Sequence, residues 1–259
     1  YYMVVTRALY ESARYEECAE RCDEVLSGGL QLHYDNVVWF RRRKALCLYY
    51  MGRTEEAIAL MREVFARKKN WFVRFELGEM LMRNGEKEEG ISLLASAAIE
   101  KGDQEKKLKL YASLANWYEN NGMPETAIRH YALIWLFRDE MGWKEDDEVR
   151  SRLDKAGVDL RDLPAPERLF EDLYPGWEEL ALKVTEQHKG VIQKLLPTGK
   201  AGFILSADGK TYYFELKEFM GRKEDASPGC KVEFILEDGF DAKKQRAVKN
   251  AVRVRPLGC

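Results

Sequence analysis

The sequence contains few of the residues and motifs that most often carry catalysis or bind metals. Its 259 residues include three histidines and five cysteines, and no histidine has a second histidine or an acid at the spacing of a zinc site. Neither a phosphate-binding Gly-x4-Gly-Lys-Ser/Thr loop nor a Gly-x-Ser-x-Gly nucleophile motif occurs. We therefore expect a protein that is not an enzyme and that needs no cofactor and no metal ion.

Long apolar runs and paired cysteine motifs are also missing. No apolar run approaches the roughly 18–20 residues that cross a bilayer, so we expect no membrane contact. Cys18 and Cys22 lie one helical turn apart without a second pair of ligands, and we interpret them as buried packing residues. The odd number of cysteines indicates a reducing compartment, and we expect the cytoplasm. The sequence starts at Tyr1 rather than Met, and it does not tell whether residues before Tyr1 are missing.

The composition is that of a globular protein with an uneven distribution of charge. Hydrophobic residues make up 46% of the chain and charged residues 33%, enough for a packed core, and the length leaves room for two domains. Residues 188–259 contain 14 Lys and Arg and 9 Asp and Glu, whereas the preceding residues contain 28 and 35. A basic segment beside an acidic one favours contact with nucleic acid.

Four segments of the first half share one turn pattern. Each has a turn residue, usually glycine, followed by acidic residues and then by a small residue. Glycine ends one helix with a positive φ, the acids open the next helix beside its N-terminal dipole, and the small residue permits close helix packing. The turns start at Ala13, Gly52, Gly85 and Gly122, with spacings of 39, 33 and 37 residues.

With this pattern, residues 1–137 resemble a tetratricopeptide-repeat array, whose period is about 34 residues. The resemblance implies an α-solenoid of helical hairpins with a concave groove that receives a protein or peptide partner. The Lys/Asn/Lys/Arg arrangement with which chaperone-binding members hold a C-terminal carboxylate is absent, and Gly90 replaces the usual alanine. We expect the partner to contact Arg42, Tyr49, Tyr50, Phe72, Phe75 and Asn116, and the same helix faces include Glu79, Arg83 and Lys109.

Residues 138–188 do not follow the repeat, and we predict that they form a helical cap and linker. Residues 146–156 have the pattern of a short charged helix. Two further helices are predicted over 167–174 and 177–187, separated at Pro175 and Gly176 because proline disfavours helix in the residue before it. Their apolar residues indicate docking on the last repeat.

Residues 189–259 contain five short apolar segments separated by glycine turns. The segments include Gly202-Phe-Ile204, Tyr212-Tyr-Phe214 and Ala247 to Arg253. Their order and spacing resemble a cold-shock domain, which implies a five-stranded OB-fold β-barrel that binds single-stranded nucleic acid. The fold class is thus α+β and multidomain, with a helical solenoid followed by a small barrel.

The cold-shock resemblance also places the residues that would contact nucleic acid. Of the rings with which the family stacks on bases, this sequence keeps only Phe203 and Tyr213, and Lys194 stands where the family has a tryptophan. Fewer rings imply weak binding of RNA or single-stranded DNA. The basic residues that we expect to meet phosphates are Lys194, Lys200, Lys243, Lys244 and Arg246.

Two hypotheses about function are compatible with the sequence. In the first, the protein is a scaffold that captures a protein partner in its groove and touches nucleic acid weakly through its barrel. In the alternative, it is a pure protein-protein interaction adaptor whose barrel no longer binds nucleic acid. The sequence specifies neither the partner nor the oligomeric state.

Overall fold

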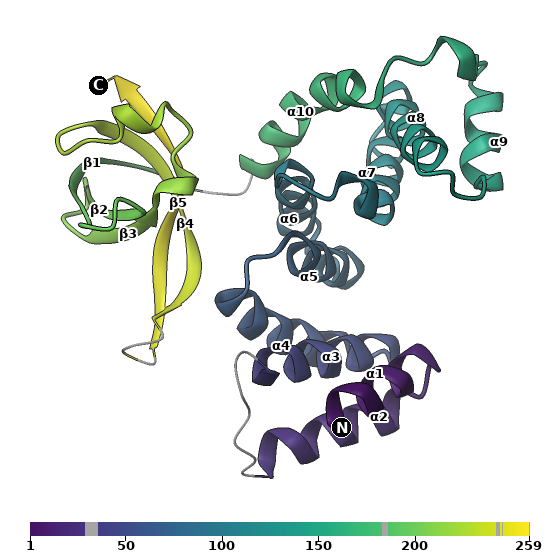
Figure 1. Ribbon diagram of the computed structural model, residues 1–259, viewed down its shortest axis with the longest axis horizontal. Coiled ribbons are helices and arrows are strands. Elements are labelled where there is room, and N and C mark those ends of the chain that lie inside the picture. Colours follow the sequence, from purple (N-terminus) through teal and green to yellow (C-terminus); the bar gives the residue numbers. More distant parts are fainter. Residues whose placement is uncertain (29–35, 183–185, 242–243, 245, 259) are drawn as a thin grey trace. The chain divides into compact units, whose positions relative to one another are not determined.

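The computed structural model describes residues 1–28, 36–182, 186–241, 244 and 246–258 (Figure 1). The chain divides into two compact units. The first, which we call the helical unit, comprises Tyr1–Val64 and Lys68–Val184, and the second, the sheet unit, comprises Phe65–Arg67 and Thr185–Cys259. The boundaries that we predict after residues 137 and 188 are a finer division and stay predictions.

The predicted array of helical hairpins is confirmed in the helical unit. The turns between successive helices contain Gly52, Gly85 and Gly122, each with a positive φ of 75° to 90°. Ala13, at the first turn, has a φ of 56°, a region that residues with a side chain seldom adopt. The helices are α1 (Tyr2–Glu11), α2 (Tyr15–Ser27), α3 (Asn36–Tyr50), α4 (Thr54–Arg67), α5 (Trp71–Asn84), α6 (Lys87–Ile99), α7 (Leu108–Asn120), α8 (Pro124–Glu140), α9 (Asp147–Lys155) and α10 (Pro166–Leu182).

The third hairpin shows why a glycine replaces the usual alanine at position 90. A Cβ atom on Gly90 would lie 2.8 Å from Cγ of Met82 and 3.0 Å from the carbonyl oxygen of Gly78. A Cβ atom on Gly78 would in turn lie 3.0 Å from the carbonyl oxygen of Gly90. The backbones of α5 and α6 therefore approach each other more closely than two residues with side chains would permit.

Helix α10 is continuous, so the predicted break at Pro175 and Gly176 is wrong. Pro175 lies inside the helix, where its missing N–H removes one hydrogen bond. Leu169, Leu173 and Trp177 follow one another at intervals of four residues and are all buried in the same core. Burial of this one face keeps both halves of the helix in register, because tertiary packing supplies most of the stability of a helix.

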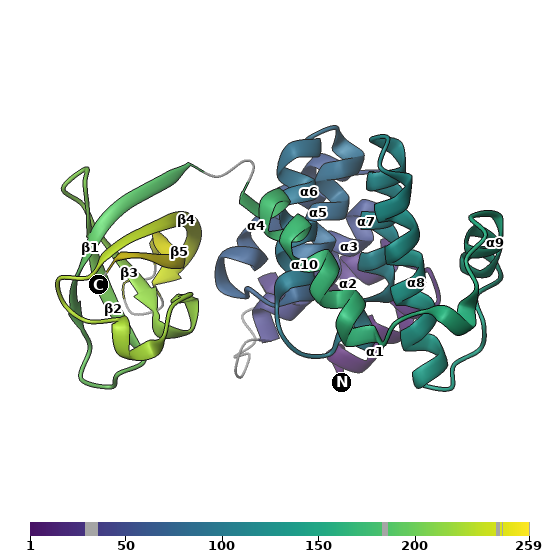
Figure 2. The same ribbon diagram turned by 90° about the horizontal axis from the view of Figure 1, so that it is seen from above.

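Helix α10 docks on α6 and α8, rather than on the last repeat alone (Figures 1 and 2). The Ser92 hydroxyl of α6 donates a hydrogen bond to the Ala181 carbonyl oxygen of α10 at 2.9 Å. Trp177 is 0% exposed, stacks on Tyr111 at 5.7 Å, and donates its indole N–H to Nε2 of His130 at 2.9 Å. The predicted charged helix corresponds to α9, whose first N–H groups are capped by the Asp146 carboxylate.

The sheet unit contains the five predicted strands. They are β1 (Gln187–Leu195), β2 (Ala201–Ser206), β3 (Thr211–Glu215), β4 (Lys231–Asp241) and β5 (Arg246–Gly258). Hydrogen bonding follows the order β1-β2-β3-β5-β4, and β4 pairs with β1 again, so the sheet closes on itself. Alternate side chains fill its interior, among them Ile192, Ile204, Phe214, Phe234 and Val254.

No helix in the described part of the chain is both long and apolar enough to span a membrane. The cytoplasmic location stays a prediction.

Candidate functional site

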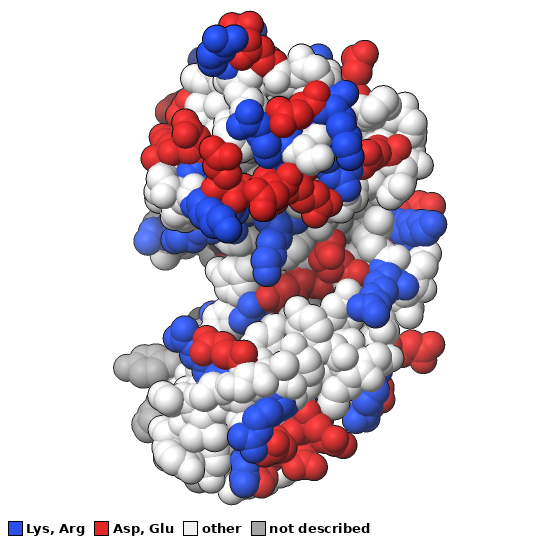
Figure 3. Space-filling model, turned by 90° about the vertical axis from the view of Figure 1, so that its right-hand side faces the viewer, with Lys and Arg blue, Asp and Glu red and all other residues white. Residues whose placement is uncertain are grey.

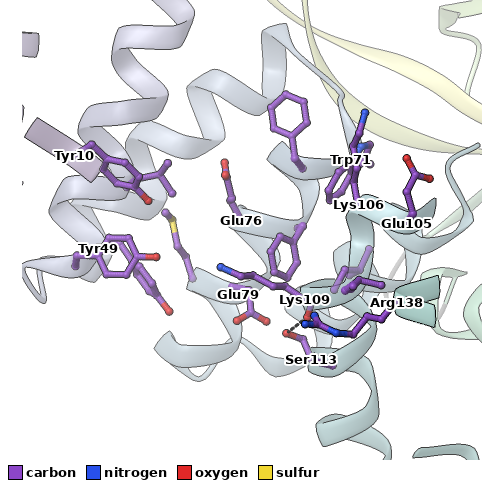
Figure 4. A pocket seen from close by; sticks show the side chains of 18 of the residues that line it. Tyr10, Tyr49, Trp71, Glu76, Glu79, Glu105, Lys106, Lys109, Ser113 and Arg138 are labelled. Carbon is purple, nitrogen blue, oxygen red and sulfur yellow. Dashed lines mark hydrogen bonds between the residues drawn. The ribbon is translucent and has the colours of Figure 1, made fainter. Parts of the chain in front are cut away.

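A cavity of about 820 Å³ lies on the helical unit, where the first helices of the successive hairpins face one side. Figure 3 shows this unit hollowed at mid-height, with acidic side chains in the hollow. Helices α1, α3, α5 and α7 supply most of the lining, and two residues come from α8 and the turn after it (Figure 4). The main lining residues are Tyr10, Leu46, Tyr49, Tyr50, Trp71, Phe72, Phe75, Glu76, Glu79, Lys109, Ser113, Arg138 and Trp143.

Helix α5 forms the floor of this cavity because of its residue spacing. Phe72, Phe75, Glu76 and Glu79 stand at positions i, i+3, i+4 and i+7, which place all four side chains on one helical face. All four line the cavity. The same face thus combines two aromatic rings with two carboxylates.

Tyrosine rings form the end of the cavity at α1 and α3. The rings of Tyr49 and Tyr50 lie 5.6 Å apart at 67°, and those of Tyr10 and Tyr50 lie 6.1 Å apart at 56°. Tyr50 also stacks on Tyr15 at 4.8 Å, yet it remains 52% exposed. Burial raises the pKa of Tyr10, and its hydrogen bond with Tyr50 raises it further. Because the rings are held by one another, they present a preformed aromatic surface.

Of the six residues predicted to contact a partner, Tyr49, Tyr50, Phe72 and Phe75 line the cavity. Arg42 lies behind the lining, where its Nε donates to Glu76 at 2.7 Å and its guanidinium carbon lies 4.8 Å from the centre of the Phe72 ring. Arg42 therefore holds two lining side chains in place.

Asn116 stands one turn beyond Ser113 and does not line the cavity. Its Oδ1 accepts a hydrogen bond from the Tyr131 hydroxyl at 2.8 Å. Asn116 follows Lys109 and Ser113 at helical spacing along α7, as predicted, but the cavity ends at Ser113. A role for Asn116 and Arg42 in partner binding stays a prediction.

The carboxylates of the cavity have different partners. Glu76 pairs with Arg42, and burial raises the pKa of Glu76 more than this pairing lowers it. Burial also raises the pKa of Glu79, and the nearby Ser113 hydroxyl, which donates to the Lys109 carbonyl oxygen at 3.1 Å, lowers this pKa by less. On the other side, Lys106 pairs with Asp103 at 3.3 Å, and Nε of Arg138 donates to the Lys144 carbonyl oxygen at 2.9 Å.

The side chains of His130, Cys18, Cys22 and Cys47 are all buried and have packing or hydrogen-bonding roles. Nδ1 of His130 lies 2.7 Å from the Thr126 carbonyl oxygen, and burial lowers the pKa of His130 to about 4. Cys18, Cys22 and Cys47 are buried in the core of the first hairpins, as predicted for the first two. Among the described residues, no group of three His, Cys, Asp or Glu side chains could hold a metal ion.

A second candidate site lies on the outer face of the sheet unit. Phe203 on β2 and Tyr213 on β3 are register partners, with ring centres 5.9 Å apart at 71°. Nζ of Lys194 lies 5.4 Å from the centre of the Phe203 ring. Since Ile204 and Phe214, the next residues along each strand, point into the interior, the two rings point outward.

The other predicted basic residues are spread over the sheet unit. Lys200 is exposed in the turn between β1 and β2. Lys244 and Arg246 are exposed near the end of the β4–β5 hairpin. Arg246 precedes Asn250, the register partner of Tyr213, by four residues, or about 13 Å along the strand. Lys243 lies outside the described residues.

Several residues that line the cavity were not predicted from the sequence, and they lie outside the helix faces that the repeat pattern predicts. Tyr10 belongs to the weakest copy of the repeat, and Trp71 opens α5. Arg138 and Trp143 lie at and beyond the end of the fourth hairpin, outside the repeat pattern. Glu76 could have been found from the spacing of Phe72 and Glu79 alone.

Comparisons with known proteins identify no activity. Residues 38–158, less than half of the chain, match a family described as "Domain of unknown function (DUF7017)". Two crystal structures of a Podosopora anserina putative kinesin light chain with nearly identical TPR-like repeats, one of them of a substituted variant, are similar to this chain. The substituted variant shares 16% identity at a TM-score of 0.46, and the other structure shares 14% identity at a TM-score of 0.45. Both matches cover 70% of this chain, and they cover 93% and 94% of the two crystallised chains, respectively. No curated protein matches the sequence.

Proposed function

We propose that the protein is a non-catalytic interaction scaffold, and that its helical unit binds a protein or peptide in the cavity on α1, α3, α5 and α7. The observation that carries this proposal is the lining itself, in which aromatic rings from successive helices converge on one open surface. Tyrosine and tryptophan supply much of the binding energy at protein interfaces, where they fill desolvated pockets. The tetratricopeptide-like sequence pattern supports the same function.

Capture of partners by the full chain tests this proposal. The double change Tyr49→Ala and Phe72→Ala removes two lining rings from neighbouring helices. Each ring of this kind contributes on the order of 2 kcal/mol, so we expect partner binding to weaken more than about a hundredfold. The matched control, Phe203→Ala with Tyr213→Ala, removes two rings from the sheet unit and should leave capture unchanged. The proposal is contradicted if the Tyr49→Ala and Phe72→Ala variant captures partners fully while its helical circular dichroism is unchanged.

We further propose that the closed sheet is an OB-fold of the cold-shock kind and that it contacts single-stranded nucleic acid weakly. The pairing of Phe203 with Tyr213, with Lys194 over the first ring, supports this second activity. Two adjacent rings offer stacking for one or two bases, and Lys194 and Lys200 can meet phosphates. Glu215, which follows Tyr213 by two residues, carries an opposing charge.

Fluorescence anisotropy of labelled single strands with the full chain tests the second activity. We expect a dissociation constant in the micromolar range or weaker, rising with salt because counterions are released on binding. Phe203→Ala or Tyr213→Ala should each cost about 1–3 kcal/mol. If anisotropy does not change at low salt and high protein concentration, the alternative holds, and the protein is a pure protein-protein adaptor. Capture that survives nuclease treatment separates the two activities.

A further inference from the structure

Glu79 lines the cavity and has no cationic partner among the described residues. It makes no ion pair with any Lys or Arg that the structure describes, and the nearby Ser113 hydroxyl donates its hydrogen bond to the Lys109 carbonyl oxygen at 3.1 Å. Glu76, three residues earlier on the same helix, is neutralised by Arg42. Figure 4 shows both carboxylates between Tyr10 and Tyr49 on one side and Ser113 and Arg138 on the other, with the Lys109 side chain reaching toward Glu79.

Burial of a charged carboxylate without a counter-ion costs free energy, because the carboxylate loses contact with water and gains no positive charge to replace it. In this cavity the cost is visible as the raised pKa of Glu79, to which no positive charge contributes. A cation from a bound ligand would supply the missing charge.

The rings beside Glu79 favour the same kind of ligand group. Tyr49 and Phe75 line the cavity together with Glu79, and Tyr50 and Tyr10 continue the aromatic surface. The faces of these rings attract ammonium and guanidinium groups at distances of up to about 6 Å. The chain already uses this contact next to the cavity, where the guanidinium carbon of Arg83 lies 5.2 Å from the Tyr49 ring centre.

The cations of the cavity do not compensate Glu79. Arg42 is held by Glu76, Lys106 by Asp103, and Arg138 by a backbone carbonyl oxygen. Lys109 is exposed on α7 and does not lower the pKa of Glu79. Figure 4 shows the Lys109 side chain reaching from α7 toward Glu79, yet among the described residues it forms no ion pair with that carboxylate, which stands beside the rings of α3 and α5.

We propose that the groove selects peptides that place a lysine or arginine side chain against Glu79, on the tyrosine-lined side of the cavity. This inference rests on the proposed function of the helical unit and names the chemistry of its ligand. The aliphatic stem of the basic residue would pack on the rings while its charged end meets the carboxylate.

Selection of short random peptides on the immobilised full chain tests this specificity. Wild-type protein should enrich peptides with Lys or Arg at one fixed position. Glu79→Gln should lose that enrichment, because the amide keeps the size and shape of the carboxylate and lacks its charge. Glu105→Gln is the matched control, since Glu105 is a carboxylate on the opposite side of the same cavity, and it should keep the enrichment.

A second measurement varies the peptide instead of the protein. Replacing the selected lysine by norleucine, which keeps the aliphatic stem, should weaken binding to wild type by about tenfold. The same replacement should change binding to Glu79→Gln less than about threefold.

The outcomes separate this inference from the proposed function. Selection of peptides without a basic preference, or a preference that persists in Glu79→Gln, overturns the role of Glu79 and leaves the groove intact as a binding site. Failure of wild-type protein to select any peptide contradicts both. Loss of all selection in Tyr49→Ala with Phe72→Ala locates the binding in the cavity.

Discussion

Acidification should destabilise the helical unit through one buried histidine. His130 is fully buried, where Nε2 accepts the indole N–H of Trp177 and Nδ1 lies against the Thr126 carbonyl oxygen. Both contacts suit the neutral imidazole with its proton on Nδ1. Protonation would place a second N–H against the Trp177 N–H, so the native fold disfavours the charged form.

The magnitude follows from the pKa of His130, which burial lowers from 6.5 to about 4. Between these values the unfolded chain binds a proton that the native protein does not, so stability rises with pH through this window. Above pH 6.5, His130 is neutral in both states and the native protein keeps its full free energy of unfolding. As the pH falls from 6.5 toward 4, that free energy decreases by about 3 kcal/mol in total. About 2 kcal/mol of this should be lost by about pH 5.

Urea unfolding of wild type and His130→Gln, followed by far-ultraviolet circular dichroism, measures this effect. Glutamine does not titrate, and its amide oxygen can still accept from Trp177. The difference between the two proteins isolates His130 because the carboxylates contribute equally to both. We expect wild type to lose about 2 kcal/mol more than the variant between neutral pH and about pH 5. Equal losses in the two proteins refute the reasoning.

Substitutions at three further positions test the packing and capping of the helical unit by urea unfolding. Gly90→Ala should destabilise by about 1–3 kcal/mol because its Cβ would lie 2.8 Å from Cγ of Met82; an unchanged midpoint contradicts the close approach of α5 and α6. Ser92→Ala should cost about 1 kcal/mol by leaving the Ala181 carbonyl oxygen without its donor, and no loss would mean that α10 docks without it. Asp146→Ala should cost about 1 kcal/mol through the lost cap of α9, whereas Asp146→Asn, which retains a capping oxygen, should cost less.

The helical hairpins could be predicted because local chemistry determines their turns. The positive φ of Gly52, Gly85 and Gly122 is a conformation that glycine adopts without strain, and each glycine marks the turn itself. Helix α10 was mispredicted for the opposite reason. Pro175 is a local signal for a break, and burial of Leu173 and Trp177 in one core overrides it.

The candidate site could be predicted only as far as helical spacing extends. Tyr49, Tyr50, Phe72 and Phe75 follow from the faces of single helices, and all of them line the cavity. Trp143 also lines the cavity, but its position there depends on how the hairpins stack on one another, which residue spacing within one helix does not determine. In the sheet unit, the outward placement of Phe203 and Tyr213 came from the cold-shock resemblance, and the buried neighbours Ile204 and Phe214 agree with it.

Site-specific photo-crosslinking tests most directly whether the cavity is the binding site. A benzoylphenylalanine in place of Tyr50, which lines the cavity and is 52% exposed, reports on what enters it. The same residue in place of Tyr1, which is 91% exposed and does not line the cavity, is the control. We predict that irradiation joins the captured partner to the protein from position 50 and not from position 1. Crosslinking of the partner from position 1 alone, or equally from both positions, contradicts the account.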